Sequence, residues 1–196
     1  MRSGKRPVDS SETVRRYYDE NPQREWDRLE GFRFEYEITK RMLARYLKAG
    51  DTVLDVGGGP GRYALWLAGQ GHDVTLVDLA GGNVAFARKK ARAQGVVLKA
   101  QRADARDLAL LGSAHYDCVL LMGPLYHLAA AKDRLAALAQ AKAHLRPGGL
   151  LFASFIALQA GLNYHLSTDP AGVAEGPVPE LFGRAFTPPL FPALGL

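Results

Sequence analysis

The sequence predicts an α/β fold built on a doubly wound parallel sheet. Three observations support this prediction. An apolar run at 52–56 ends in a group of glycines, after which a helical pattern occupies 62–69. A second apolar run, at 73–77, ends at Asp78. A third, at 116–121, is almost continuously apolar, as is typical of a parallel strand that helices cover on both faces.

The composition indicates one globular domain of ordinary type. The chain has 196 residues and a hydrophobic fraction of 47%, which is enough to form a sizeable core. Its single cysteine, Cys118, excludes an internal disulfide and is expected to be a small core residue, and no metal site is expected. No apolar run reaches membrane-spanning length, and residues 1–6 lack the apolar core of a signal peptide. A cytoplasmic location without a membrane partner is therefore expected.

The net charge of +5 raises the question of nucleic-acid binding. Basic residues are nevertheless dispersed among acidic ones along most of the chain. The exception is a short run on a predicted helix that comprises Arg88, Lys89, Lys90 and Arg92. On a helix such a run is more often a solvated face than a phosphate-binding surface, so nucleic acid is not expected as a partner.

The N-terminal section is predicted to form a lead-in and three helices. Residues 1–9 are expected to be disordered and basic. A helical pattern begins at residue 10 or 11 and is broken by Pro22, and a short helix follows at 23–29. A third helix, at 34–47, is amphipathic, and most apolar residues of this section are expected to pack against the sheet. The apolar residues that repeat at helical spacing in this third helix are Ile38, Met42 and Tyr46.

Helices and strands continue to alternate after the second strand. The predicted elements are a helix at 82–94 closed by Gly95, a strand at 96–101, a helix at 106–111, the strand at 116–121, a helix at 131–145 and a strand at 150–156. The helix at 131–145 is alanine-rich, and a Pro-Gly-Gly turn separates it from the last strand. The chain contains no internal repeat.

The glycine-rich turn after the first strand is typical of a nucleotide site. Gly57, Gly59 and Gly61 allow positive φ and leave no Cβ between the backbone and a ligand. The helix that follows offers free N–H groups to an acidic group of the ligand. Asp78, about twenty residues further on, is placed to accept hydrogen bonds from ribose hydroxyls. A dinucleotide fingerprint would have its third glycine at position 62, where this chain has Arg62.

The Gly-x-Gly-x-Gly spacing, with Asp55 two residues before it, resembles motif I of the class I S-adenosylmethionine-dependent methyltransferases. Asp78 matches the motif II acid of that family. The resemblance covers roughly residues 12–155. It implies a Rossmann-like sheet with strand order 3-2-1-4-5. S-adenosyl-L-methionine would bind at the carboxyl ends of strands one and four, where that order reverses.

The resemblance also implies which residues contact the cofactor. The glycine turn would lie along the methionine part, and an aromatic hydroxyl of the preceding helix can reach its carboxylate, although core packing is an alternative role for Tyr17 or Tyr18. Asp104, in a segment that resembles motif III, would accept the adenine amino group, or it caps the next helix instead. The expected cofactor-binding residues are Tyr17, Tyr18, Asp55, Gly57, Gly58, Gly59, Gly61, Asp78, Leu79, Asp104, Ala105, Met122, Gly123 and Tyr126.

The segment after the fourth strand faces the transferable methyl group in this family. Methyltransferases that act on nucleic-acid bases often carry Asn or Asp there, followed by Pro-Pro-aromatic, and Met122 in place of that acceptor counts against this activity. The segment resembles the Leu-His-His-Leu-like turns of small-molecule methyltransferases. His127 is therefore the candidate general base, with a pocket-shaping role as the alternative.

The resemblance ends at residue 156. Family members usually continue with a helix and an antiparallel strand pair, but six of the eleven prolines lie between 170 and 192. Because proline removes a ladder donor, residues 157–196 are expected to be an irregular tail in which this C-terminal hairpin is missing. The strand at 150–156 would then be an open edge that invites self-association or a cover. The tail residues that could form the cover are Phe182, Phe186 and Phe191.

The sequence thus predicts a methyltransferase domain at 10–156. The expected function is S-adenosylmethionine-dependent methyl transfer to a small-molecule acceptor by in-line displacement, which depends on positioning more than on a strong base. One alternative is a protein that binds the cofactor but no longer catalyses because its C-terminal part is altered. A less favoured alternative is an NAD-dependent oxidoreductase, which would require glycine at position 62.

Overall fold

The computed structural model describes residues 10–31 and 33–157. The chain divides into two units, Met1–Ser154 and Phe155–Leu196, and all helices and strands of the described residues belong to the first. The predictions for residues 1–9 and for 158–196 lie outside the described residues. These include the basic lead-in, the missing C-terminal hairpin and the phenylalanine cover.

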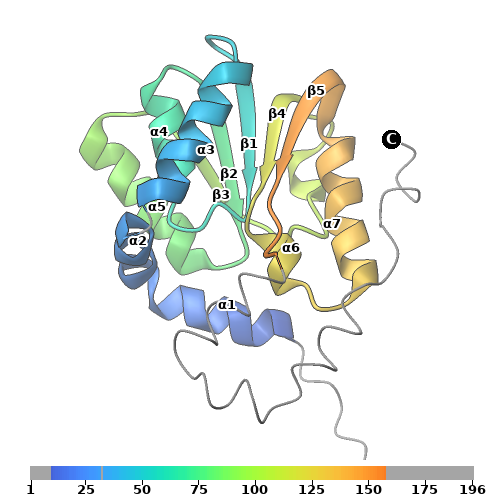
Figure 1. Cartoon of the computed structure of the whole chain (residues 1–196). Coiled ribbons are helices and arrows are strands. Elements are labelled where there is room, and N and C mark those ends of the chain that lie inside the picture. The colour runs from blue at the N-terminus through green and yellow to red at the C-terminus, as the bar shows by residue number, and fades with distance from the viewer. Residues whose placement is uncertain (1–9, 32, 158–196) are drawn as a thin grey trace, which may run out of the picture. The chain divides into compact units, whose positions relative to one another are not determined.

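The described part of the chain forms one five-stranded parallel sheet with the order β3-β2-β1-β4-β5, which confirms the predicted order (Figure 1). The strands are β1 (Thr52–Val56), β2 (Asp73–Asp78), β3 (Lys99–Arg102), β4 (Tyr116–Leu121) and β5 (Leu145–Ala153). In the register of the central strands, Val56 pairs with Val77 and Leu54 with Val119. The carboxyl ends of β1, β2 and β4 therefore meet at one edge of the sheet, where the strand order reverses.

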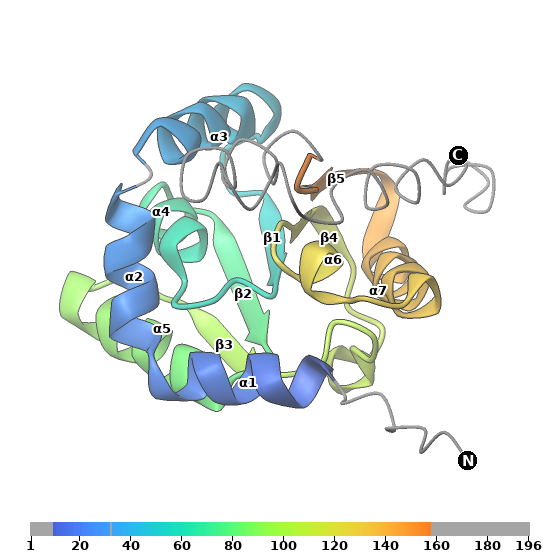
Figure 2. The same ribbon diagram turned by 60° about the horizontal axis from the view of Figure 1, so that its bottom comes forward.

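Helices cover both faces of this sheet. In Figures 1 and 2, α3, α4 and α5 lie on one face and α7 lies on the other, while α1 lies across the carboxyl ends of the strands. No helix in these described segments is long and apolar enough to cross a membrane. The helices are α1 (Ser10–Glu20), α2 (Pro22–Gly31), α3 (Arg33–Tyr46), α4 (Arg62–Gly69), α5 (Gly81–Gln94), a 3₁₀ turn (Ala109–Leu111), α6 (Pro124–His127) and α7 (Ala131–Ala143).

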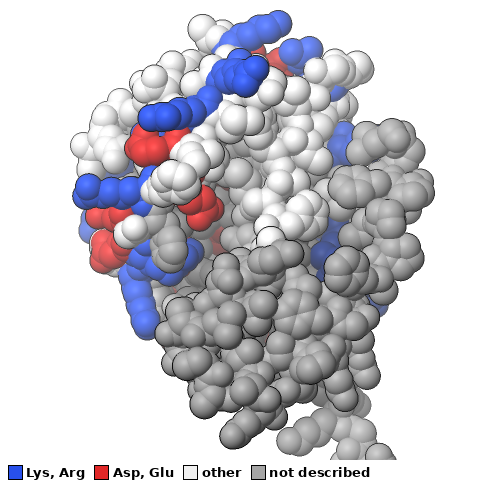
Figure 3. Space-filling view, viewed as in Figure 1, with Lys and Arg blue, Asp and Glu red and all other residues white. Residues whose placement is uncertain are grey.

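The apolar stripe of α3 is largely turned to solvent, contrary to the prediction, although the ring of Tyr46 contacts that of Phe152 of β5 with centroids 6.2 Å apart. Ile38, Met42 and Tyr46 are 44%, 42% and 45% exposed. The helix instead turns a neighbouring stripe inward, on which Leu43 is fully buried and Leu47, just past the helix end, packs on the core. Both stripes have helical spacing, so periodicity alone could not choose between them. Figure 3 shows this face, with Lys and Arg gathered at the end of α3 that leads into β1.

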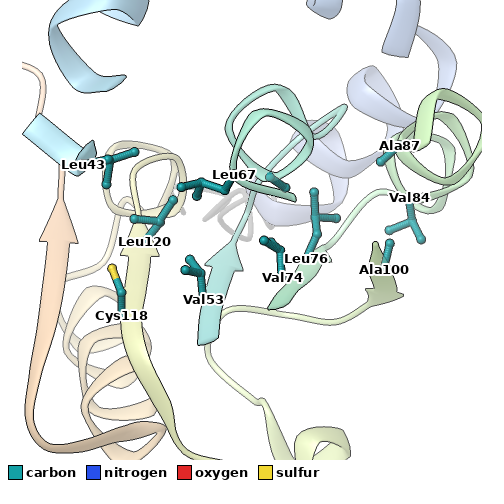
Figure 4. Packing of buried hydrophobic residues seen from close by; sticks show 11 residues of the cluster. Leu43, Val53, Leu67, Val74, Leu76, Val84, Ala87, Ala100, Cys118 and Leu120 are labelled. Carbon is teal, nitrogen blue, oxygen red and sulfur yellow. The ribbon is translucent and has the colours of Figure 1, made fainter. Parts of the chain in front are cut away.

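The core lies between the sheet and the layer formed by α3, α4 and α5 (Figure 4). Val53, Leu76 and Leu120 project from β1, β2 and β4 and are fully buried, and Leu67 of α4 packs against them. Each such side chain contributes about 1.5–3 kcal/mol by leaving water. Cys118 belongs to the same cluster, as predicted, and burial raises the pKa of its thiol to about 12.

Three predicted elements differ most from the structure. Strand β3 begins at Lys99 rather than at 96, and Val97 is 83% exposed, because the sheet edge pairs only from Lys99 onward. The predicted helix at 106–111 is only the 3₁₀ turn. Strand β5 begins at Leu145, with an irregularity around Gly148 at φ +74°, and ends at Ala153 instead of at residue 156.

Candidate functional site

The glycine turn after β1 passes close beneath the segment that follows β4. Gly57 has φ +68°, and its N–H donates to the carbonyl of Val77 over 2.7 Å. A Cβ on Gly57 would lie 2.5 Å from Cγ of Pro124, so no larger residue fits without movement of one of the two segments. Gly59 also has positive φ, at +58°. The turn therefore presents bare backbone at the carboxyl edge of the sheet.

Asp78 links this turn to the start of α5. Its Oδ2 accepts a hydrogen bond from the N–H of Gly59 over 2.8 Å, and its Oδ1 accepts from the N–H of Ala80 over 2.9 Å and from Nδ2 of Asn83 over 3.2 Å. Burial raises the pKa of the Asp78 carboxyl, although these three donors oppose the shift. A carboxylate has about four acceptor positions, so one is left for a ligand hydroxyl.

Asp55 lies beneath the glycine turn rather than facing a ligand. It is 3% exposed, and its Oδ2 has no hydrogen-bond partner among the described residues. A Cβ on Gly58 would lie 2.5 Å from that oxygen, so the glycine makes room for the carboxylate. Burial and the nearby charge of Asp78 raise the pKa of Asp55 to about 7. Asp55 is thus a buried support of the turn.

A cavity opens at the carboxyl ends of the strands, between the turns that follow β1 to β4 and the helices α1 and α2. It brings together most of the predicted site residues from segments that are distant in the sequence. The predicted residues that line it are Tyr18, Gly57, Gly59, Asp78, Leu79, Asp104, Ala105, Gly123, Tyr126 and His127. The lining residues that were not among the predicted site residues are Arg15, Glu25, Ala80, Asn83, Ala103, Pro124 and Leu128, of which Pro124 and Leu128 belong to the segment that was expected to face the methyl group.

Five predicted site residues do not line this cavity. Asp55, Gly58 and Gly61 support the turn, and a Cβ on Gly61 would lie 3.0 Å from Cβ of Ala87. Met122 packs against the core instead. Tyr17 is 45% exposed and contacts the ring of Tyr18 edge-on, so it belongs neither to the cavity nor to the core.

Asp104 lines the cavity, but its carboxylate is held by a neighbour. Nη2 of Arg106 donates to its Oδ2 over 2.6 Å, and the N–H of Arg106 donates to its Oδ1 over 2.9 Å. Partial burial, which raises the pKa of the Asp104 carboxyl, is outweighed by these bonds, so the pKa is lowered. The carboxylate therefore holds a local turn through Arg106, and it does not cap the 3₁₀ turn, which begins at Ala109. The adenine contact stays a prediction.

Tyr18 and His127 meet across the cavity, although they are separated by 109 positions in the sequence. The Tyr18 hydroxyl lies 3.2 Å from Nε2 of His127, and the two rings are edge-on with centroids 5.6 Å apart. Burial raises the pKa of Tyr18 to about 12 and lowers that of His127. Both groups are therefore neutral near pH 7. The phenol donates the hydrogen bond if the imidazole is protonated at Nδ1, and Nε2–H donates it to the phenol oxygen in the other tautomer.

The helices α1 and α2 form the side of the cavity that lies away from the sheet. The N–H of Gly82 donates to Oδ1 of Asp19 over 2.9 Å, which fixes α1 to the start of α5. Arg15, one turn earlier, pairs with Asp19 over 3.1 Å. Glu25 is 8% exposed and accepts from Nε of Arg28 over 2.8 Å. The sequence predicted these helices, but no local motif shows which side of each helix faces the cavity.

Arg62, where a dinucleotide site would have glycine, points toward the N-terminal helices. Its guanidinium carbon lies 4.5 Å from the ring centroid of Tyr36 and 5.6 Å from that of Trp26. Its Nη1 also donates to the Trp26 carbonyl over 3.4 Å. Arg62 therefore attaches α2 and α3 to the start of α4, and a glycine would lose these contacts.

Comparisons with known proteins agree with this geometry. Residues 53–149 match the family described as a methyltransferase domain. A ubiquinone biosynthesis O-methyltransferase from Xanthomonas axonopodis pv. citri is 34% identical over 140 residues, which cover 71% of this chain and 55% of that protein. A glycine/sarcosine N-methyltransferase from Parasynechococcus marenigrum is 32% identical over 156 residues, which cover 77% and 55%.

Solved structures show the same fold. The structure of a SAM-dependent methyltransferase from Methanosarcina mazei matches with a TM-score of 0.56 and 24% identity, over 66% of each chain. The chain spans about half the length of the curated relatives named above. The similarity therefore concerns the domain that carries the cavity, not the whole of those relatives.

Proposed function

Because the chain belongs to the class I S-adenosylmethionine-dependent methyltransferases, we propose that it transfers a methyl group to a small-molecule acceptor by in-line displacement. Its cofactor is S-adenosyl-L-methionine, which when bound supplies a methyl group on a positively charged sulfur. One observation supports the proposal most directly. The glycine turn, Asp78 and the segment 123–128 line the same cavity. The residues proposed to bind the cofactor therefore lie next to those proposed to bind the methyl acceptor.

The residues present fit the cofactor. Gly57 and Gly59 offer bare backbone at positive φ, as a close ligand contact requires. Asp78 keeps one acceptor position for a ribose hydroxyl. At the end of β3, Asp104 and Ala105 are proposed to contact the adenine. Tyr18 is proposed to reach the methionine carboxylate from α1.

The acceptor is proposed to occupy the end of the cavity formed by Pro124, Tyr126, His127 and Leu128, with Glu25 opposite. This end is mainly apolar and aromatic, which suits a small organic molecule with few polar groups. One relative named above is an O-methyltransferase and the other an N-methyltransferase, so similarity leaves the accepting atom open. The chain's own contribution is to hold the acceptor at contact distance and in line.

The proposal is tested first by ligand binding. Thermal unfolding is measured with S-adenosylmethionine, S-adenosylhomocysteine, NAD and NADP, because a ligand at 100 times its Kd stabilises the folded state by about 2.7 kcal/mol. We expect S-adenosylhomocysteine to raise the Tm and NAD to leave it unchanged. Preferential stabilisation by NAD would contradict the assignment, because Arg62 then would not prevent dinucleotide binding.

The second step is transfer of a labelled methyl group to a panel of phenols, carboxylates and amines. Methylation of one class would identify the accepting atom. Binding of S-adenosylhomocysteine without transfer to any acceptor would support the alternative of a cofactor-binding protein that no longer catalyses. The variant Asp78→Ala is the control in both steps, because it removes the proposed ribose acceptor while the fold of β2 remains.

A further inference from the structure

Four large apolar side chains form a stripe along the solvent side of α3. They are Phe34, Ile38, Met42 and Tyr46, and we call them the α3 stripe. Their exposed fractions are 81%, 44%, 42% and 45%, respectively. Residues four positions apart lie on one side of a helix, so these side chains are contiguous over a helix about 21 Å long. Contiguous exposed apolar residues of this kind mark interaction surfaces.

Charges along α3 are segregated beside the stripe. Glu35 and Glu37 lie in its first half together with Arg33, whereas Lys40, Arg41 and Arg45 lie in its second half. Glu37 forms an ion pair with Lys40 over 2.8 Å, which leaves Glu35 as the acidic group at the start of the helix. Figure 3 shows basic side chains at the end next to β1, and acidic and basic side chains together further toward the other end of α3. The helix therefore presents an apolar line with two carboxylates and one cation beside its first half and three cations beside its second half. Such a surface is complementary to an antiparallel copy of itself.

We propose that the α3 stripe is a self-association surface on which a second copy of this chain docks its own α3 in an antiparallel, two-fold arrangement. Centring the two stripes on each other places Phe34 opposite Tyr46 and Ile38 opposite Met42. The same symmetry places Glu35 opposite Arg45, twice. A parallel arrangement would instead set like charges against each other. A two-fold contact uses the same patch on both partners, which is what a self-complementary stripe provides.

The contact is small, so the dimer is weak. Ridges spaced by four residues pack between two helices with axes 8–10 Å apart, as a general tendency. One helix pair of this length buries less than the roughly 1,200 Å² of a stable interface, which indicates a dissociation constant in the micromolar range or above. Exposed ion pairs add little affinity but fix the register and the direction.

Sedimentation velocity on the full chain tests the proposal, from about 5 to about 500 µM, where a contact of this size becomes populated. We expect a monomer–dimer equilibrium that Ile38→Glu weakens by roughly tenfold or more, because the symmetry sets both introduced carboxylates at the interface. Leu151→Lys on β5 is the matched control. It alters the strand edge that the sequence suggested for self-association, and we expect it to leave the equilibrium unchanged.

A charge exchange tests the direction of the helices. Glu35→Arg alone and Arg45→Glu alone should each weaken the dimer by roughly 3- to 10-fold, since each variant places like charges opposite each other twice. An equimolar mixture of the two variants should associate again, because both contacts between positions 35 and 45 then join opposite charges. Added salt should weaken the wild-type dimer modestly.

Three results would overturn the proposal. The first is a monomer at every concentration. The second is association that survives Ile38→Glu and is lost in Leu151→Lys, which would assign it to the β5 edge. The third is a monomer whose thermal midpoint falls in Ile38→Glu, which would show that another part of the chain covers the stripe. Far-UV circular dichroism of each variant verifies that the fold is retained.

Discussion

The two ends of the parallel sheet hold aspartates whose pKa values are shifted in opposite directions. At the amino end, the N–H and hydroxyl of Thr52 each donate to Oδ2 of Asp117 over 2.7 Å, and Arg146 forms an ion pair with the same carboxylate. These hydrogen bonds lower the pKa of Asp117 to about 2. At the carboxyl end, Asp55 is buried without a partner for Oδ2 among the described residues, and its pKa is raised to about 7.

This difference in pKa distinguishes an aspartate that stabilises the fold from aspartates that lie at the candidate binding site. Asp117 joins β1 to β4 and β5 and gains stability from being charged. Asp55 and Asp78 instead sit under and beside the glycine turn, where no cation compensates them in the described structure and only N–H groups hold Asp78. Poorly compensated carboxylates reduce stability, and such positions concentrate where a ligand is to be bound.

The largest expected effect is at the glycine turn. Gly57→Ala must adopt positive φ and places its Cβ 2.5 Å from Cγ of Pro124, so we expect a loss of about 2–5 kcal/mol in the free energy of unfolding. Gly71→Ala is the matched control, because Gly71 also has positive φ but a Cβ added there would meet no atom within 4 Å. It should lose only about 1–2 kcal/mol, from conformation alone.

Urea unfolding of both variants and binding of S-adenosylhomocysteine are the measurements. Only Gly57→Ala should lose ligand affinity as well as stability. Equal losses of stability in the two variants, with affinity intact, would mean that the approach of the turn to Pro124 is not needed for the site.

The next effect is the pH dependence that Asp55 imposes. Its folded pKa of about 7 lies above the unfolded value of about 3.9, so the folded state binds the extra proton between these values. Stability therefore falls as the pH rises from about 4 to about 7, by about 4 kcal/mol as an upper limit. Asp55→Asn should remove this slope, and urea unfolding at pH 5 and pH 8 measures it.

Asp117→Asn is the control for that experiment, and its effect has the opposite sign. The pKa of Asp117 is lowered to about 2, so its contribution is complete above about pH 4 and is lost as the pH falls through 2. This variant should leave the slope between pH 5 and pH 8 intact. If wild type and Asp55→Asn gave parallel curves over that range, Asp55 would be ionised in the folded state and the comparison of the two sheet ends would fail.

A smaller effect is expected at the two ends of β2. Asp78→Ala should weaken cofactor binding by roughly 1–3 kcal/mol, since ribose hydroxyls lose a charged acceptor. Asp73→Ala, at the amino end of the same strand, removes an exposed ion pair with Lys99 at 2.8 Å and should leave affinity unchanged. Isothermal titration calorimetry of both variants decides the matter. Equal affinity in wild type and Asp78→Ala would exclude Asp78 from the site.

Much of the fold could be predicted, because apolar runs and turn glycines indicate the same element boundaries. The apolar runs of β1 and β4 and the glycines around α4 indicated the correct bounds, and the family resemblance indicated the strand order. The inward side of α3 could not be predicted, since Leu43 and Met42 belong to two equally periodic stripes. The start of β3 was also wrong, because an edge strand has one partner and apolar residues alone do not extend it.

The residues of the candidate site also divide into those that the sequence could predict and those that it could not. Gly57 and Asp78 were identifiable because a motif of fixed spacing carries them. Arg15 and Glu25 were not, because they reach the cavity only through the packing of α1 and α2, which no short-range pattern encodes. The contact between Tyr18 and His127 was missed for the same reason. In the structure the Tyr18 hydroxyl lies 3.2 Å from Nε2 of His127 and orients the imidazole.

The smallest effect is expected for His127→Ala, which should lower kcat by about tenfold or less. The reason is the contact between His127 and Tyr18. The Tyr18 hydroxyl is hydrogen-bonded to Nε2 of His127, so in either tautomer this nitrogen is engaged and is not free to accept a proton from a methyl acceptor. An acceptor with a free amine or phenolate needs no such base. Steady-state kinetics with an acceptor identified in the panel measures the effect, and His115→Ala, at the amino end of β4, is the matched control.

The pH profile and Tyr18→Phe distinguish a shaping role from catalysis. The pKa of His127 is lowered by burial, so a catalytic imidazole would give an acid limb in kcat below about pH 6.5, with activity lost as the pH falls. We expect no such limb, and we expect Tyr18→Phe to lower kcat no more than His127→Ala does. A loss of about 100-fold or more in His127→Ala with intact cofactor affinity, together with an acid limb that this variant abolishes, would make His127 the general base. The carboxyl end of the sheet would then hold a catalytic group in addition to a binding surface.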